Sequence, residues 1–400
     1  MTNRQLRVLF FVEGFTDIRF VVGLSEVCDL TMAVAAEPYA RGGLRERVAR
    51  SGARLTVEEI PGGRLAFQAR ALAYLWRRAA DFDVILSQEV LRGSLNANLV
   101  GLVRRVPVVT YMGIAPVEYF RCRRERGQIG RAEAAVGEAV IRALMTVNGR
   151  LAARCLAMGP YLRDVAARYC PRSEVGLYYG VDTDFFRPAG EAERAELRRR
   201  RALPADKFLV FLSSRISHEK DPETVLRATA LARARGLDAV LLNLGGGYED
   251  FLKLAGEMRL PRAPEWVLGR PAAHPMTEVA DYFRAADAVA LGSLAEGAAY
   301  STLEALACAT PVVATDIGGM AVQLKGHARL TPRRDAGAMA EQLLWVAANP
   351  AEARAQALRG REYVRRHWNR QKAFGDLRRV LEEVSEGRAV AGERSAHASG

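Results

Sequence analysis

The chain has 400 residues, a formal net charge of +12 and 50% hydrophobic residues, which fits a folded globular protein of about two domains. It contains no apolar run long enough to span a membrane, and its first residues lead into a strand pattern without a signal-peptide core, so we expect a cytoplasmic protein. Its five cysteines are scattered without C-x-x-C spacing, which favours neither a disulfide framework nor a zinc site.

Short apolar runs alternate with amphipathic helical patterns along the chain. In the first half, strands are predicted at 6–12, 30–34, 83–86, 106–111 and 155–158, with helices at 67–80 and 95–104. In the second half, strands are predicted at 208–212, 239–244, 267–268, 288–291 and 312–314. This alternation implies parallel sheets covered on both faces, so we predict an α/β protein with two doubly wound domains.

A charged stretch separates the two predicted domains. We assign residues 1–188 to a first Rossmann-like domain, 189–204 to a linker and 205–350 to a second Rossmann-like domain. Helices over 351–384 are expected to cross back to the first domain. The tail 385–400 lacks periodicity and is expected to be disordered.

The positive charge is concentrated in the first half of the chain. Residues 1–200 hold 31 arginines, no lysine and 22 acidic residues, which leaves a net charge of +9. The densest stretch, 119–131, interleaves aromatic and basic side chains. Because no nucleic-acid-binding motif is present, an anionic acceptor or peripheral contact with the inner face of a membrane is favoured over nucleic acid. A solvated arginine-rich face is the alternative.

The segment 293–319 is the clearest candidate for a functional site. Glu296 lies before a predicted helix and Glu304 lies in the first turns of that helix, after the strand 288–291. Open α/β sheets bind ligands at the carboxyl ends of their strands, and a helix N-terminus offers unpaired N–H groups to an anionic or hydroxyl-rich ligand. Two solvated glutamates in an ordinary strand–helix unit are the alternative.

Several stretches, taken together, resemble one family. They are YYGVDTDFFRP at 178–188, LSSRISHEK at 212–220, LNLGGG at 242–247, AADAV at 285–289 and the segment 293–319. In this order they resemble the retaining nucleotide-sugar glycosyltransferases of glycosyltransferase family 4, which have the GT-B architecture of two facing Rossmann-like domains. The resemblance implies that the first domain binds the acceptor and the second binds the donor.

The resemblance also implies a role for each matching residue. Arg215 and Lys220 correspond to the basic pair that holds the donor diphosphate, where fixed cations favour the charge that develops on the leaving group. Glu296 corresponds to the carboxylate that binds hydroxyls of the donor sugar, and Glu304 to the one that binds the nucleotide ribose. The remaining donor-binding positions are Gly297, Ala298, Ala299, the turn 245–247 that begins with Gly245, and Gly14.

The chain departs from the family pattern at several positions. Only Gly14 stands where many members have two glycines, and Tyr111-Met112 stands where many have a histidine. Ala299 and Ala309 replace glycines in the second domain. The segments 13–19, 89–98 and 111–131 follow strand ends and are expected to face the acceptor. The candidate acceptor-binding residues are Tyr111, Met112, Arg121 and Arg124.

The implied reaction moves a sugar from a UDP- or GDP-linked donor to a hydroxyl of a glycan, a lipid-linked or glycolipid acceptor, or a small molecule. A front-face route without a metal or another cofactor suits these residues better than double displacement, which needs a carboxylate nucleophile. The triplet Asp182-Thr-Asp184 lies in a turn before the linker, so it is not expected to bind a metal. Motifs of dehydrogenases, hydrolases and P-loop enzymes are missing. A non-catalytic sugar-nucleotide binder and a GT-B sugar-nucleotide epimerase are the alternatives.

Overall fold

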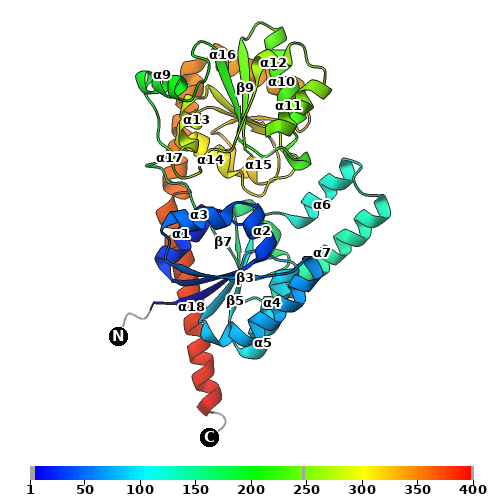
Figure 1. Cartoon of the computed structure of the whole chain (residues 1–400), viewed down its shortest axis with the longest axis vertical. Helices are drawn as coiled ribbons and strands as arrows, with labels where there is room; N and C mark the ends of the chain where they lie inside the picture. Colours follow the sequence, from blue (N-terminus) through cyan, green and yellow to red (C-terminus); the bar gives the residue numbers. More distant parts are fainter. Residues whose placement is uncertain (1–4, 246–247, 398–400) are drawn as a thin grey trace. The chain divides into compact units, whose positions relative to one another are not determined.

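The computed structural model describes residues 5–245 and 248–397, and the chain divides into two compact units. Unit 1 comprises Met1–Val117, Ala132–Gly180 and Gln371–Gly400. Unit 2 comprises Glu118–Arg131 and Val181–Arg370. Each unit is built on one parallel sheet with helices around it, so the predicted α/β class with two doubly wound domains is confirmed (Figure 1).

Unit 1 contains a seven-stranded sheet in the order β3-β2-β1-β4-β5-β6-β7, in which all neighbouring strands are parallel. Its strands are β1 Arg7–Val12, β2 Asp29–Ala35, β3 Leu55–Ile60, β4 Val84–Ser87, β5 Val108–Met112, β6 Arg154–Ala157 and β7 Ser173–Val175. The central strand β1 is almost wholly buried because its apolar side chains face helices on both sides of the sheet.

Helices cover both faces of this sheet. They are α1 Ile18–Val27, α2 Ala36–Arg41, α3 Leu44–Ser51, α4 Arg64–Arg78, the 3-10 turn η1 Ala79–Asp81, α5 Arg92–Arg104, α7 Arg131–Leu151, α8 Pro160–Ala167 and α18 Arg370–His397. The helix α6 Pro116–Glu125 follows β5, and its residues from Glu118 onward belong to unit 2. On one face, Phe20 of α1 packs against Phe10 and against Phe374 of α18, with ring centroids 5.3 and 6.1 Å apart. On the other face, Phe67 of α4 and Ala97 of α5 enter the core.

Unit 2 contains a six-stranded parallel sheet in the order β10-β9-β8-β11-β12-β13. Its strands are β8 Phe208–Leu212, β9 Ala239–Leu244, β10 Val267–Arg270, β11 Ala288–Leu291, β12 Val312–Thr315 and β13 Arg329–Thr331. Its helices are α9 Glu191–Arg200, η2 His218–Lys220, α10 Pro222–Ala234, α11 Tyr248–Glu257, α12 Ala263–Trp266, α13 Val279–Ala285, α14 Tyr300–Ala307, α15 Gly318–Leu324, α16 Ala336–Ala348 and α17 Pro350–His367. The five strands β8 to β12 are the ones predicted from apolar runs in this half of the chain.

Three strands were not predicted, and all three lie at sheet edges. β3 and β7 end the sheet of unit 1, and β13 ends that of unit 2. β3 reads Leu-Thr-Val-Glu-Glu-Ile and only its last residue is buried. An edge strand is half solvated, so its sequence lacks the continuous apolar run that marks a central strand.

The observed units also differ from the predicted domain boundaries. The segment Glu118–Arg131 belongs to unit 2, although it lies within the predicted first domain. Most of the predicted linker is the helix α9. Residues 385–397, expected to be disordered, continue the helix α18 to His397. These residues are rich in alanine, glutamate and arginine, and extension of an existing helix avoids the cost of nucleation.

The helix α9 is held to the sheet of unit 2 by a buried arginine. Arg198 is 7% exposed, and its guanidinium lies 2.6 Å from a carboxylate oxygen of Asp287, directly before β11. It also donates to the carbonyl oxygens of Ala285, Pro204, Ala205 and Lys207. All of its donor groups therefore find acceptors, as a buried charge requires.

We predict that Arg198→Leu destabilises the protein by about 3 kcal/mol, because it leaves buried carbonyl groups without their donor and removes one of the two arginines that pair with Asp287. Arg199→Leu on the same helix is the matched control, since the Arg199 side chain is 77% exposed and Glu196 is its one ion-pair partner among the described residues. Its effect is expected to stay below about 0.5 kcal/mol. Urea unfolding of both variants measures the difference, and equal effects would contradict the anchoring role.

Candidate active site

Two loops of unit 2 meet because their preceding strands are neighbours in the sheet. β8 pairs with β11 in parallel, with Val210 beside Ala288 and Phe211 beside Val289. The loop after β8 therefore lies next to the loop after β11 at the carboxyl edge. The backbone N–H of Leu294 donates to the carbonyl oxygen of Glu219 at 2.7 Å, which fixes the two loops to each other.

The predicted residues Lys220 and Glu296 form an ion pair across these loops. Lys220 ends η2 after β8, and Glu296 lies between β11 and α14. Their side chains are 15% and 11% exposed, respectively. At this burial the surrounding protein screens the two charges less than bulk water would, so the pair holds both side chains in place.

Glu219 connects the third predicted charged residue to the same loops. One of its carboxylate oxygens accepts a hydrogen bond from Tyr119 at 2.7 Å and one from Arg215 at 3.2 Å. Burial would raise the pKa of Glu219, but the hydrogen bond from Tyr119 and the charge of Arg215 oppose this effect, and the pKa lies below its ordinary value. Arg215 itself is 70% exposed, so its guanidinium can reach a ligand in solution.

The backbone between Glu296 and α14 is shaped by close contact with α15. The N–H of Gly319 donates to the carbonyl oxygen of Glu296 at 2.8 Å. A Cβ atom on Gly319 would lie only 1.7 Å from the carbonyl oxygen of Gly297, so only glycine allows this approach. Within the described part of the chain, no protein acceptor takes the backbone N–H groups of Gly297, Ala298 or Ala299. These groups precede the N-terminus of α14, and Ala298 is partly exposed.

Three hydrogen bonds to the carbonyl oxygen of Ala299 fix the turn at this residue. Its carbonyl oxygen accepts from the backbone N–H and the hydroxyl of Thr302 and from the amide of Gln323. Both of these side chains are buried. Ala309, which also replaces an expected glycine, lies two residues after the end of α14 and has a left-handed φ of 52°. Alanine adopts such a φ at a higher cost than glycine, so this position is one that glycine would fit better.

Glu304 and Gly245 are two further predicted donor-binding residues of unit 2. Glu304 is on α14 and is 4% exposed. Gly245 follows β9 with a φ of 133°, a conformation that L side chains rarely adopt, and its N–H donates to the carbonyl oxygen of Arg270 at 3.2 Å. The two glycines at 246–247, which we grouped with it, lie outside the described residues.

Buried polar atoms beside β8, β9 and β11 were not singled out from the sequence. Asn243 on β9 donates from its amide to the carbonyl oxygens of Leu212 and Ser214, each at 2.9 Å, and so shapes the loop that carries Arg215. The hydroxyls of Ser213, Ser214 and Ser293 are buried and have no hydrogen-bond partner within the described residues. Such groups are costly without a partner, so they offer hydrogen bonds to a ligand. Ser213 and Ser214 stand next to Arg215 in the LSSRISHEK motif.

The segment 119–131 is largely engaged with unit 2. Arg126 pairs with Asp221 at 2.7 Å and with Glu223 at 3.0 Å. Cys122 packs with Leu294 and Ala295, next to Glu296. Arg121 and Arg124, proposed from the sequence for the acceptor, are exposed on α6. Aromatic and basic residues of this segment thus bind the loops after β8 and β11.

The remaining predicted residues belong to unit 1. Gly14 follows β1 in an open position, with no atom within 4 Å of an added Cβ. Tyr111 and Met112 are each 2% exposed, and the Tyr111 hydroxyl donates to the carbonyl oxygen of Gly176 at 2.6 Å. Their side chains are core residues of unit 1, in contrast to the expected contact with an acceptor. The apolar strand β5 that carries them is buried throughout.

Two carboxylates meet at the carboxyl edge of the sheet in unit 1. Glu89 accepts the backbone N–H of Ser94 at 3.0 Å at the start of α5, and Glu13 pairs with Arg92 at 3.0 Å. Burial, together with the charge of Glu13, raises the pKa of Glu89 to about 7. Both residues lie in the segments that we expected to face the acceptor.

The described residues contain neither a metal-binding cluster nor a membrane-spanning helix. Over residues 5–245 and 248–397, no group of three or more His, Cys, Asp or Glu side chains could hold a metal ion. In the same part of the chain, no helix has the length and hydropathy needed to cross a membrane.

The part of unit 2 that carries these loops is similar to a known protein family. Residues 193–363 match the family described as glycosyl transferases group 1. D-inositol 3-phosphate glycosyltransferase 1 of Catenulispora acidiphila is 31% identical over 62% of this chain and 59% of its own length. The D-inositol 3-phosphate glycosyltransferase of Saccharomonospora viridis is 34% identical over 48% of this chain and 46% of its own length. The chain spans about half the length of the curated relatives that it matches.

Solved structures share the fold at low sequence identity. The Anabaena protein HepE in complex with UDP-glucose has a TM-score of 0.76 and 16% identity, and covers 94% of this chain and 100% of its own. Sucrose-phosphate synthase from Thermosynechococcus elongatus has a TM-score of 0.71 and 16% identity, over 95% of this chain and 100% of its own. The predicted GT-B fold is thereby confirmed.

We predict that Gly319→Ala destabilises the protein by about 2 kcal/mol, because its methyl group would overlap the carbonyl oxygen of Gly297. Gly256→Ala in α11 is the matched control, since an added Cβ there meets no atom within 4 Å. Thermal unfolding should show a lower midpoint for Gly319→Ala and an unchanged or higher one for Gly256→Ala. An unchanged midpoint for Gly319→Ala would show that the two segments are not in this contact.

A second prediction concerns the pH dependence of stability. The pKa of Glu89 is raised from 4.5 to about 7 in the folded chain, so between these values the folded state binds more protons than the unfolded state. The free energy of unfolding should therefore fall as the pH rises through this window, and Glu89→Gln should reduce the fall. Urea unfolding at several pH values measures it, with Glu37→Gln, an exposed glutamate, as the control. Identical slopes in Glu89→Gln and in the unchanged protein would contradict the raised pKa.

Proposed function

We propose that the chain transfers a sugar from a nucleoside-diphosphate sugar to an acceptor hydroxyl, with retention of configuration, because residues 193–363 match the family described as glycosyl transferases group 1. The observation that carries this proposal is the arrangement of Arg215, Lys220 and Glu296 on two adjacent loops of unit 2. Cations for a diphosphate and a carboxylate for sugar hydroxyls stand together there, as such a donor requires.

The donor diphosphate is proposed to bind between the loop after β8 and the start of α14. The exposed guanidinium of Arg215 and the ammonium of Lys220 supply positive charge. The unpartnered N–H groups of Gly297, Ala298 and Ala299 supply hydrogen bonds at a helix N-terminus, a setting that favours phosphate. The hydroxyls of Ser213 and Ser293 offer further donors. The Anabaena structures contain UDP or UDP-glucose, which makes uridine nucleotides the first donors to test.

The proposed reaction follows a front-face route. The bond between the anomeric carbon and the leaving phosphate oxygen breaks, and the acceptor oxygen forms a bond to that carbon on the same face. The acceptor proton passes to the leaving phosphate, so no protein base is required. Arg215 and Lys220 stabilise the charge that develops on this phosphate, and Glu296 accepts hydrogen bonds from hydroxyls of the donor sugar. Because the two side chains provide the countercharge, we propose that the reaction needs no metal.

The acceptor is proposed to be a hydroxyl of a glycan, a lipid-linked sugar or a small molecule. Two curated relatives are named D-inositol 3-phosphate glycosyltransferases, so an inositol phosphate is the first small molecule to test. Arg121 and Arg124 are exposed cations of the kind that an anionic acceptor would contact. Glu13 and Glu89 at the edge of the sheet in unit 1 can accept hydrogen bonds from hydroxyls.

The test is a panel of UDP- and GDP-linked sugars with and without acceptors, followed by release of the nucleoside diphosphate. We predict that Arg215→Ala, Lys220→Ala and Glu296→Gln each lower kcat by about 100-fold or more, because each removes a contact that strengthens in the transition state. Lys253→Ala is the matched control, since Lys253 is an exposed lysine that pairs with Glu257. It should keep full activity.

Proton NMR of the anomeric signal gives the configuration of the product. Inversion would contradict the front-face route while leaving the donor site intact. Full activity in Lys220→Ala and Glu296→Gln would show that the site is elsewhere. Nucleotide binding without transfer to any acceptor would favour the alternative of a sugar-nucleotide binder.

A further inference from the structure

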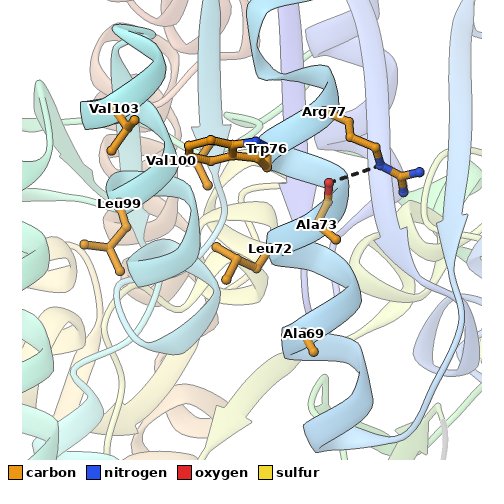
Figure 2. Close-up of a pocket in the computed structure, with 8 residues that line it drawn as sticks. All are labelled: Ala69, Leu72, Ala73, Trp76, Arg77, Leu99, Val100 and Val103. Carbon is orange, nitrogen blue, oxygen red and sulfur yellow. Dashed lines mark hydrogen bonds between the residues drawn. The ribbon is translucent and has the colours of Figure 1, made fainter.

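An apolar groove lies between two helices on the outer surface of unit 1 and has no part in the proposed reaction. It is formed by α4 and α5 and has a volume of about 660 Å³. Figure 2 shows Trp76 and Leu72 projecting from α4 beside Leu99 and Val103 of α5. The full lining is Ala69, Leu72, Ala73, Trp76, Arg77, Leu99, Val100 and Val103. We call this surface, with the adjacent Leu102, the α4–α5 face.

The apolar side chains of this face are exposed although the same helices also build the core. The inner sides of α4 and α5 bury Phe67, Leu75 and Ala97 against the sheet. The outer sides leave Leu72, Trp76, Leu99, Leu102 and Val103 between 42% and 64% exposed. A surface helix normally presents polar residues to water on its outer side. A contiguous apolar patch in that position marks a site of interaction.

The charged side chains of the two helices that form the groove have one sign. The helices α4 and α5, with the following residue Arg105, contain seven arginines and no lysine, aspartate or glutamate. The Arg104 guanidinium lies 5.4 Å from the ring centroid of Trp76, and Arg77 contacts the carbonyl oxygen of Ala73 (Figure 2). Within the described residues, Arg77, Arg104 and Arg105 have no ion pair. The surface that covers this face must therefore accept apolar side chains and carry negative charge.

This combination separates the possible occupants. A second copy of the chain docked by the same face would place arginines against arginines, which is unfavourable. The interface of a bilayer with anionic lipids satisfies both requirements, because apolar side chains enter below the headgroups while arginine stems extend to the phosphates. Tryptophan, apolar with one N–H donor, is enriched at that depth.

We propose that the α4–α5 face docks unit 1 on a membrane surface that contains anionic lipids. This site differs from the segment 119–131, which the sequence had suggested for membrane contact. In that segment, Tyr119 and Arg126 are bound to carboxylates of unit 2. The α4–α5 face, in contrast, combines exposed apolar side chains with arginines that have no ion pair within the described residues.

The experiment is co-sedimentation of the full chain with vesicles of phosphatidylcholine alone and of phosphatidylcholine with phosphatidylglycerol. We expect binding to the anionic vesicles that weakens between about 0.1 M and about 1 M salt, where screening becomes strong. Leu99→Asp combined with Val103→Asp should lower the bound fraction at least tenfold. The matched control is Leu231→Asp combined with Val322→Asp, which changes two similarly exposed apolar residues in unit 2. Thermal unfolding confirms that both variants fold.

Tryptophan fluorescence provides a readout that does not depend on these variants. Trp76 is 49% exposed, whereas Trp266 and Trp368 are buried and Trp345, on α16 of unit 2, is half-buried. Anionic vesicles should shift the emission of the unchanged protein to shorter wavelength, and Trp76→Phe should abolish that shift while vesicle binding persists.

Several results would overturn the proposal. One is the absence of binding to anionic vesicles. Another is binding that Arg121→Glu with Arg124→Glu abolishes and Leu99→Asp with Val103→Asp does not, which would locate the membrane contact in the segment 119–131. A dimer that Leu99→Asp with Val103→Asp disrupts, in the absence of vesicle binding, would identify the face as a self-association surface.

Discussion

The ion pair between Lys220 and Glu296 is the interaction on which the arrangement of unit 2 as a candidate donor site depends. β8 and β11 are neighbours in a parallel sheet, so the loops at their carboxyl ends cannot avoid each other. The loop after β8 carries Arg215 and Lys220, and the loop after β11 carries Glu296. The ion pair between Lys220 and Glu296, whose side chains are mostly buried, joins the two loops. The hydrogen bond from Leu294 to Glu219 adds a backbone link. These links place the N–H groups of residues 297–299, which have no acceptor within the described residues, next to the cations that a diphosphate would contact.

The central part of the fold could be predicted from the sequence because its signals are local. Strands such as β8 and β12 are buried on both faces and read as continuous apolar runs. The edge strands β3, β7 and β13 lack that signal because half of their surface meets water. The sequence of the helix α9 was interpreted as a charged linker. Its arginines bind Asp287 and Asp281, which lie about 80 to 90 residues further along the chain. No local sequence pattern connects these acids to the helix.

The site was predictable to the extent that its residues lie in ordered motifs. Arg215, Lys220 and Glu296 come from two motifs that the sheet topology brings together. The role of Asn243 in shaping the loop could not be seen, because its partners are backbone carbonyl groups on another strand. The docking of the segment 119–131 on unit 2 is likewise a long-range contact between charges. Tyr111 and Met112 were expected at the carboxyl end of their strand, facing an acceptor. Both lie inside the buried strand β5, because this strand ends at Met112, one residue later than predicted.

The most direct test of the donor site is an NMR titration of the full chain carrying ¹³C-labelled alanine methyl groups with uridine or guanosine diphosphate. The methyl signals of Ala298 and Ala299, assigned by single substitution to glycine, should shift with a saturable dependence on one of the two nucleotides. The signal of Ala71, buried in the core of unit 1, should stay unchanged. Saturating concentrations of both nucleotides that leave Ala298 and Ala299 unchanged would contradict the assignment of the donor site.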